Sequence, residues 1–167
     1  MTGGGRTAVT VEQVRSAGGS DVERLVELTA AFRSAVATKR GGTDTRAADE
    51  GGQPPEASHE ALAAYVAGPG TTALVGLLDA WTAGMALCRV DDGGRSRRGV
   101  LDVCYVEPGA REVGLGQLLL ERSVAWFRAQ GCTGVDGTAF PGDRGAKQFY
   151  ESAGFKARLL VMHLPLG

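Results

Sequence analysis

The chain has 167 residues, a length that suits a single domain (1–167) with one hydrophobic core. Apolar residues make up 43% of it and the formal net charge is -1, which is typical of a globular protein and gives no general attraction to nucleic acid or to anionic membranes. No apolar run approaches the roughly 18 residues of a membrane-spanning helix, and residues 1–6 lack the apolar segment of a secretory signal. The three cysteines stand far apart and form no C-x-x-C pair, so we expect free thiols and a cytoplasmic protein.

The first third of the chain predicts a strand, a helix and a long loop. Residues 7–15 alternate loosely between β-branched and polar residues and favour a strand. Apolar positions recur at helical spacing from Val22 to Phe32, and Asp21 precedes them as a candidate N-cap. Glycines and prolines dominate residues 39–57, which indicates a flexible internal loop of the kind that often contributes to binding.

The middle of the chain predicts an antiparallel meander. A short helix is expected at 58–66, before two apolar runs, 72–78 and 81–90, that only two residues separate. A polar turn at 91–99 leads into a third strand at 100–106. Short connections of this kind join antiparallel neighbours.

The last third alternates between helix and strand. We expect helices at 114–130 and 143–153, and strands at 132–140 and 155–164. Together with the meander, this order predicts an α/β (α+β) fold in three layers, with a mixed central sheet of about six to seven strands flanked by about four helices.

The junction between the strand 100–106 and the next helix is rich in glycine. A helix N-terminus presents unpaired N–H groups and a positive dipole end, so it binds anions readily. Gly114 and Gly116 remove side chains that would keep phosphate oxygens from the backbone, and Arg111 can add a charged contact.

A Rossmann dinucleotide site is the alternative for such a loop. Asp136 lies about twenty residues beyond Gly116, as that motif requires. However, Leu119 occupies the place of the third glycine, and three predicted antiparallel strands precede the loop. Both features argue against a Rossmann unit.

Two spaced motifs give a more specific indication. The first is Val106-x-Pro108-x-x-Arg111-x-x-Gly114-x-Gly116, and it resembles the acetyl-CoA pyrophosphate loop of the GNAT superfamily of N-acetyltransferases. The second is Asp143-x-x-Ala146-x-x-Phe149-Tyr150-x-x-x-Gly154-Phe155, and it is similar to that family's other signature, in the expected order and separation. The order of predicted elements agrees along the whole chain.

The resemblance implies where acetyl-CoA binds. In that family the strand before the loop splays from its neighbour, and its backbone bonds the pantetheine arm; here those groups belong to Cys104, Tyr105 and Val106. The phosphates are held mostly by main-chain N–H groups, which the resemblance assigns to Arg111, Glu112, Val113, Gly114, Leu115, Gly116 and Gln117.

Tyr150 is the implied general acid, since the family places a tyrosine here to protonate the departing thiolate. A phenol with a pKa of about 10 stays protonated at neutral pH. The alternative is packing, because Ala146, Phe149, Tyr150 and Ala153 share one helical face. Asp143 stands where relatives often carry an asparagine that contacts the coenzyme; a carboxylate cannot donate that hydrogen bond, so we expect Asp143 to cap the helix.

A general base is harder to identify. Asp102 is the leading candidate, because a lone carboxylate in an apolar strand needs a reason, and period-two alternation places it on one face with Cys104 and Val106. A salt bridge or an edge position would explain it equally. Glu107 is second, and proton loss through water to bulk solvent is the remaining route.

These residues predict an enzyme that transfers acetyl from acetyl-CoA to a primary amine by direct attack, since no cysteine occupies a motif position. The acceptor is expected to be a small molecule; a protein N-terminus or lysine is the alternative. A non-catalytic CoA-binding regulatory module is the alternative from another class. The sequence shows no metal-ligand cluster, so we expect no metal, and it leaves a homodimer open.

Overall fold

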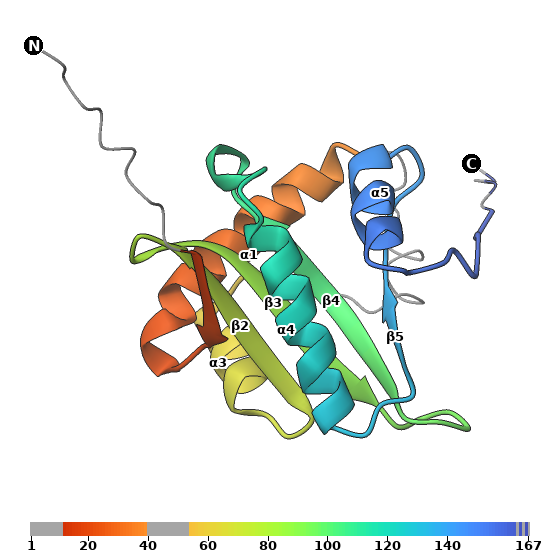
Figure 1. Cartoon of the computed structure of the whole chain (residues 1–167), viewed down its shortest axis with the longest axis horizontal. Helices are drawn as coiled ribbons and strands as arrows, with labels where there is room; N and C mark the ends of the chain where they lie inside the picture. The colour runs from red at the N-terminus through yellow and green to blue at the C-terminus, as the bar shows by residue number, and fades with distance from the viewer. Residues whose placement is uncertain (1–11, 40–53, 163, 165, 167) are drawn as a thin grey trace, which may run out of the picture.

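The computed structural model describes residues 12–39, 54–162, 164 and 166. Its elements, in chain order, are β1 Glu12–Ser16, the 3-10 turn η1 Gly19–Asp21, α1 Val22–Ala37, α3 His59–Ala67, β2 Thr71–Leu78, β3 Trp81–Asp91, β4 Arg98–Val106, the 3-10 turn η2 Pro108–Ala110, α4 Leu115–Ala129, β5 Gly134–Gly137 and α5 Arg144–Ser152. Within these residues the sheet has five strands in the order β1-β2-β3-β4-β5 (Figure 1). Neighbours are antiparallel except β4 and β5, which are parallel.

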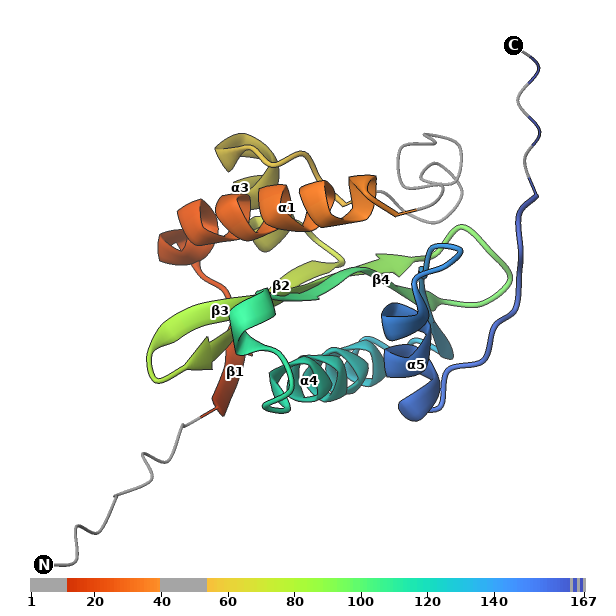
Figure 2. The ribbon, with the colours of Figure 1, turned by 90° about the horizontal axis from the view of Figure 1, so that it is seen from above.

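Helices cover both faces of this sheet, which confirms the predicted three-layer fold. Helices α1 and α3 lie on one face, and α4 and α5 lie on the other (Figure 2). Alternate residues of the central strands point to opposite faces. The core under α1 and α3 therefore contains Met85 and Leu87, whereas the core under α4 contains Ala86 and Cys88.

Most predicted elements are confirmed. The β2–β3 hairpin turns on Asp79 and Ala80, whose φ angles of 47° and 73° are those of a two-residue turn that matches the twist of the strands. Helix α4 ends before Gly131, which has a φ of 75°. Ser58 caps α3 by accepting a hydrogen bond from the N–H of Ala61 at 3.3 Å.

The predicted capping role of Asp21 is wrong in detail. Its carboxylate makes no hydrogen bond to the first turn of α1. It accepts instead from the N–H of Gly18 at 2.8 Å and from Arg15 at 2.7 Å. The hydrogen bond with Arg15 is the main cause that lowers the pKa of Asp21. Asp21 thus fixes the turn before α1 and ties it to β1.

The predicted strand at 155–164 is not formed by the described residues of that range. Their large side chains are exposed, among them Leu159, Leu160 and Met162. The neighbouring edge strand β5 has only four residues, of which Gly134 and Gly137 offer no side chain for cross-strand packing. The resulting sheet has one strand fewer than the lower end of the expected range.

Two expectations fall on other parts of the chain. Residues 7–11 of the predicted first strand, and residues 40–53 of the predicted loop, lie outside the described residues.

Among the helices that are described, none has both the length and the apolar character needed to cross a membrane.

Candidate active site

Strands β4 and β5 separate halfway along β4. The parallel pairing runs from Arg98↔Gly134 to Leu101↔Gly137 and then stops. On its other side, β4 stays paired with β3 as far as Val106. Between Asp102 and Val106, the edge of β4 that faces β5 therefore has no strand partner within the described residues, and the two strands diverge there (Figure 1). This is the splay that the resemblance to the GNAT superfamily implies.

A bulge interrupts β4 where the splay begins. Leu87 pairs with Val103 and Cys88 pairs with Leu101, so Asp102 is an extra residue with no partner in β3. The extra residue breaks the period-two alternation, and the predicted common face of Asp102 with Cys104 and Val106 is wrong. Cys104 and Val106 pack in the core under α4, whereas the Asp102 carboxylate turns toward α3.

The Asp102 carboxylate is fully enclosed by two partners. Tyr65 of α3 donates its hydroxyl hydrogen to Oδ2 at 2.8 Å. Arg89 of β3 contacts Oδ2 through Nε and Oδ1 through Nη2, each at 3.3 Å. The Asp102 side chain has 0% exposure, and burial raises its pKa although Arg89 and Tyr65 act in the opposite direction. The salt bridge considered from the sequence is thus present.

Glu107, the second candidate base, is engaged at the other end of β4. Its carboxylate contacts Nη2 of Arg24 at 2.8 Å and accepts from the indole N–H of Trp81 at 3.2 Å. The Arg24 guanidinium also lies 4.5 Å from the centre of the Trp81 ring. Glu107 thus belongs to a cluster beside the β2–β3 hairpin and not to the start of the splay.

The predicted phosphate loop forms an open start to α4. Arg111, Glu112, Val113 and Gly114 are all exposed. Gly114 is left-handed, with φ of 93°, and no side chain caps the first turn of the helix. The N–H groups of that turn are therefore available to an anion.

Arg111 has a partner that the sequence did not indicate. Its Nε donates to the carbonyl oxygen of Val106 at 2.9 Å, and its guanidinium lies 5.8 Å from the centre of the Tyr105 ring. One of the backbone groups expected to bind the pantetheine arm is thus occupied by Arg111. The remaining candidates on this edge are the backbone groups of Cys104 and the N–H of Val106. The backbone groups of Tyr105, which was also expected to bind the arm, face β3, where Met85 is the partner of Tyr105.

Helix α4 approaches both β4 and α5 closely at Gly116. A Cβ placed on Gly116 would lie 3.4 Å from the Phe149 ring and 3.7 Å from Val106. The Sγ of Cys104 lies 4.0 Å from the carbonyl oxygen of Gly116. Burial raises the pKa of the Cys104 thiol to about 12, so this thiol stays protonated and is a poor nucleophile at neutral pH.

Tyr150 lies on α5 beside the end of β5. Asp143 caps this helix by accepting from the N–H of Ala146 at 3.1 Å, as expected. The Tyr150 ring packs between two aromatic neighbours, with centroids 5.4 Å from Phe149 and 5.1 Å from Phe155. Burial raises the pKa of the Tyr150 hydroxyl above its ordinary value of 10.0. The phenol therefore remains protonated well beyond neutral pH.

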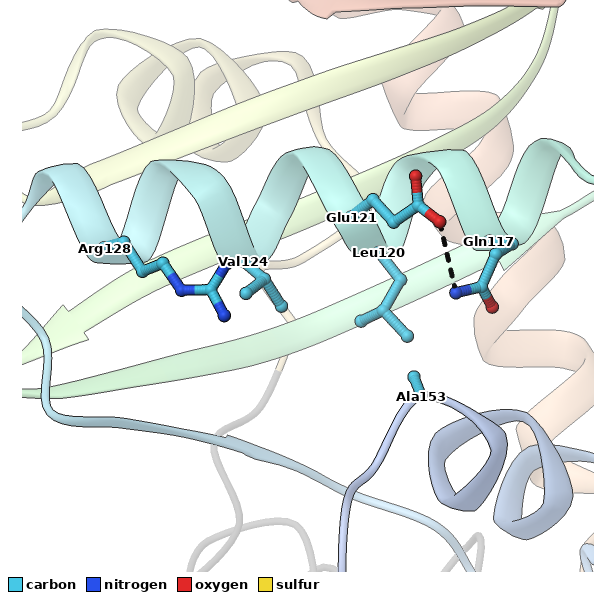
Figure 3. A pocket seen from close by; sticks show the side chains of 6 residues that line it. All are labelled: Gln117, Leu120, Glu121, Val124, Arg128 and Ala153. Atoms are coloured by element: carbon cyan, nitrogen blue, oxygen red, sulfur yellow. Dashed lines mark hydrogen bonds between the residues drawn. The ribbon is translucent and has the colours of Figure 1, made fainter.

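A groove of about 240 Å³ runs along α4 beside the end of α5. Figure 3 shows the six lining side chains, which are Gln117, Leu120, Glu121, Val124, Arg128 and Ala153. Gln117 donates to Glu121 at 3.5 Å. The groove begins at Gln117, the last residue of the phosphate loop, so Gln117 borders both.

Sequence reasoning missed three residues around the splay: Tyr65, Arg89 and Gly137. The first two hold Asp102, but nothing in the chain order shows that α3 packs over the bulge. Gly137 is the last residue of β5 and lies against the Tyr150 ring, a contact between distant segments that the chain order does not show. No group of three or more His, Cys, Asp and Glu side chains in the described part of the chain could hold a metal ion.

The chain is similar to known acetyltransferases. A family model described as the acetyltransferase (GNAT) family matches residues 43–155. No curated protein matches the sequence.

Three solved structures illustrate the similarity in fold. A tetramutant of the BH1408 protein from Bacillus halodurans is 18% identical, with a TM-score of 0.73 over 92% of this chain and 99% of that one. The aminoglycoside N-acetyltransferase AAC(6')-Iy in complex with CoA is 15% identical, with a TM-score of 0.69 over 95% and 97% of the two chains. The aminoglycoside acetyltransferase meta-AAC0020 from an uncultured soil metagenomic sample, in complex with sisomicin, is 16% identical, with a TM-score of 0.68 over 93% and 95%.

Proposed function

The chain belongs to the acetyltransferase (GNAT) family, and from this premise we propose that it transfers the acetyl group of acetyl-CoA to a primary amine of a small molecule. The observation that carries the proposal is the meeting of three features at one place. These are the unpaired edge of β4, the open glycine-containing start of α4, and the Tyr150 hydroxyl beside the end of β5.

The residues present fit acetyl-CoA. Main-chain N–H groups of residues 112–117 would hold the pyrophosphate, since no side chain caps this turn and the loop is exposed. The backbone groups of Cys104 and the N–H of Val106 would bind the pantetheine amides along the open edge of β4. Arg111 would add a charge to the phosphates after leaving the Val106 carbonyl. Gln117 would border the phosphates. Asp143 would act indirectly, because it caps α5, the helix that carries Tyr150.

Acetyl-CoA supplies the activated acetyl group, and Tyr150 would act as the general acid. The amine nitrogen would form a bond to the acetyl carbon and give a tetrahedral intermediate, and the collapse of this intermediate would break the carbon–sulfur bond. The Tyr150 hydroxyl gives its proton to the departing sulfur, and the amine's proton passes through water to solvent, from which the phenolate is reprotonated. Burial raises the pKa of Tyr150, so its hydroxyl is protonated at neutral pH before the sulfur departs.

Asp102 is better suited to hold the bulge than to accept a proton. A raised pKa would favour a base, but both carboxylate oxygens already have partners and the side chain is not exposed. We therefore propose that Asp102 anchors β4 to α3, and that water removes the proton from the amine.

The acceptor class rests on the neighbours in fold. Two of them are aminoglycoside acetyltransferases, one with CoA and one with sisomicin. These similarities favour a small molecule with several amines over a peptide, and they leave the individual acceptor open.

The experiment tests a panel of amines as acceptors and measures the free CoA thiol that the reaction releases. Purified protein is incubated with acetyl-CoA and one class of amine at a time: aminoglycosides, aliphatic polyamines or lysine peptides. Thiol release and mass-detected acetylation with a small amine are expected. Turnover with peptides alone would overturn the acceptor class, and binding of acetyl-CoA without turnover on any amine would indicate a regulatory module.

The phosphate loop is tested separately by a Gly114→Glu variant. A carboxylate at the start of α4 would repel the phosphates, and a side chain at a φ of 93° adds backbone strain. Calorimetry should show acetyl-CoA affinity weaker by about tenfold or more, equivalent to about 1.4 kcal/mol. Gly109→Ala is the matched control, because its Cβ would meet nothing within 4 Å. Equal affinity for Gly114→Glu and wild type would remove this loop from the site.

We also propose that the chain forms a homodimer through its exposed C-terminal segment, residues 159–162. These four residues are apolar and 49% to 83% exposed. Arg158 contacts Asp136 of β5 at 3.5 Å, so the segment starts beside the edge of β5 that has no partner among the described strands. A second copy supplies the same segment and the same edge, so a two-fold exchange would cover both.

A further inference from the structure

Gly137 lies where β4 and β5 separate, and it leaves room for the Tyr150 ring. It is the last residue of β5 and the last to pair with β4, opposite Leu101. A Cβ placed on Gly137 would lie 2.8 Å from Cε1 of Tyr150, 2.9 Å from Cζ and 3.1 Å from Oη. Real Cβ atoms almost never come within 3.0 Å of another heavy atom, so any side chain here would displace the phenol.

The backbone at Gly137 gives no other reason for glycine. Among the described residues, the glycines with positive φ are Gly70, Gly114, Gly131, Gly142 and Gly154, and Gly137 is not one of them. An L-residue can therefore adopt its backbone conformation without strain. What excludes a side chain at this position is the hydroxyl-bearing edge of the Tyr150 ring.

The Tyr150 ring has little freedom to move aside. Phe149 and Phe155 flank the ring. The backbone carbonyl of Tyr150 accepts hydrogen bonds from the N–H groups of Ala153 and Phe155, both at 3.1 Å. These contacts hold the ring and the end of α5 together. A small rotation of the ring would thus not absorb a clash at Gly137, and the phenol would be pushed away from β5 together with its hydroxyl.

We propose that Gly137 is a positioning residue: its lack of a side chain seats the Tyr150 phenol against β5, with the hydroxyl at the opening between β4 and β5. The inference rests on the proposed function, in which this hydroxyl protonates the departing thiolate. A displaced hydroxyl would slow the chemical step and change acetyl-CoA affinity little, because the groups proposed to bind acetyl-CoA are main-chain groups of β4 and of the phosphate loop.

The test compares Gly137→Ala with Gly134→Ala in the same strand. A Cβ on Gly134 would meet nothing within 4 Å, so this control adds the same methyl group to β5 without touching Tyr150. We expect Gly137→Ala to lower kcat by about ten- to a hundredfold, since a misplacement of about 1 Å can cost that much. Acetyl-CoA affinity should stay within about threefold in both variants, and Gly134→Ala should keep the kcat of the wild type.

A double-mutant cycle with Tyr150→Phe separates positioning from general damage. If Gly137 acts through the hydroxyl, Gly137→Ala should cost little kcat in the Tyr150→Phe background. An equal loss in both backgrounds, or unchanged kcat for Gly137→Ala, would overturn the inference. If Tyr150→Phe itself leaves kcat unchanged, it is the proposed role of Tyr150 that fails, so the two failures are distinguishable.

Discussion

At the level of single residues, Asp102 shows how a local backbone irregularity decides the role of a side chain. As a lone carboxylate in an apolar strand it is a candidate catalytic base, and period-two alternation predicts that it shares a face with Cys104 and Val106. The bulge turns it instead toward Tyr65 and Arg89, which use both carboxylate oxygens. A buried carboxylate with such partners stabilises packing between α3, β3 and β4.

An Asp102→Asn variant tests this structural role. Asparagine can still accept from Tyr65, but its amide nitrogen cannot accept the second hydrogen bond from Arg89, so we expect the free energy of unfolding to fall by about 1–2 kcal/mol. The kcat of Asp102→Asn should stay within about threefold of the wild-type kcat. A loss of kcat by about a hundredfold or more, without loss of stability, would make Asp102 the base after all.

The difference in stability between wild type and Asp102→Asn should depend on pH in a defined direction. The native pKa of Asp102 lies above its ordinary value of 3.8, so the native chain holds that proton more tightly than the unfolded chain. Wild type therefore loses stability relative to Asp102→Asn as the pH rises through the window above 3.8. Urea denaturation should show a smaller gap between the two proteins at pH 7 than near pH 4.

Other residue predictions depended on chain-local information and could be made from the sequence. Asp143 caps α5 because capping needs only residues a few positions apart. The partners of Asp102 and the neighbour of Gly137 come from elements far along the chain. Periodicity alone does not show those contacts, and it fails where a bulge adds one residue.

At the level of elements, the packing of α4 on the sheet depends on a glycine in β4. Phe127 of α4 is fully buried, and a Cβ on Gly99 would lie 2.4 Å from its ring. The ring thus occupies the space over Gly99 that a side chain would fill. This contact fixes how closely the far end of α4 approaches β4.

A Gly99→Ala variant should therefore destabilise the fold. Overpacking of a filled core costs about 1–3 kcal/mol, because the ring or the helix must shift. Urea denaturation measures the loss, and Gly109→Ala, whose Cβ meets nothing within 4 Å, should stay within about 0.5 kcal/mol of wild type. A Gly99→Ala protein as stable as wild type would mean that α4 can move away from β4 at little cost.

Long amphipathic helices and the hairpins could be predicted because their signals lie within each segment. The segment 155–164 carries the apolar residues of a strand, yet the described residues there form none. A strand needs a partner as well as a composition, and β5 offers only four residues. The sequence pattern of the segment contains no information about that edge.

At the level of the whole molecule, the exposed C-terminal segment predicts self-association. A Leu160→Asp variant should shift the molecular mass measured by light scattering from that of a dimer toward that of a monomer, because a charge in an apolar interface is costly. Lys156→Asp is a matched control that also adds an acidic residue to the exposed segment before the apolar run. A monomeric wild type, or a dimer that Leu160→Asp leaves intact, would contradict the proposed exchange.

The most direct test of acetyl transfer at the splay is single-turnover transfer from acetyl-CoA by wild type and Tyr150→Phe, with an amine that the panel identifies. Both proteins are saturated with acetyl-CoA, so the rate reports the chemical step alone. Transfer by Tyr150→Phe should be about ten- to ten-thousandfold slower, with acetyl-CoA affinity nearly unchanged, because only the proton donor is lost. Equal transfer rates at every pH would contradict the account and leave Tyr150 as a packing residue of α5.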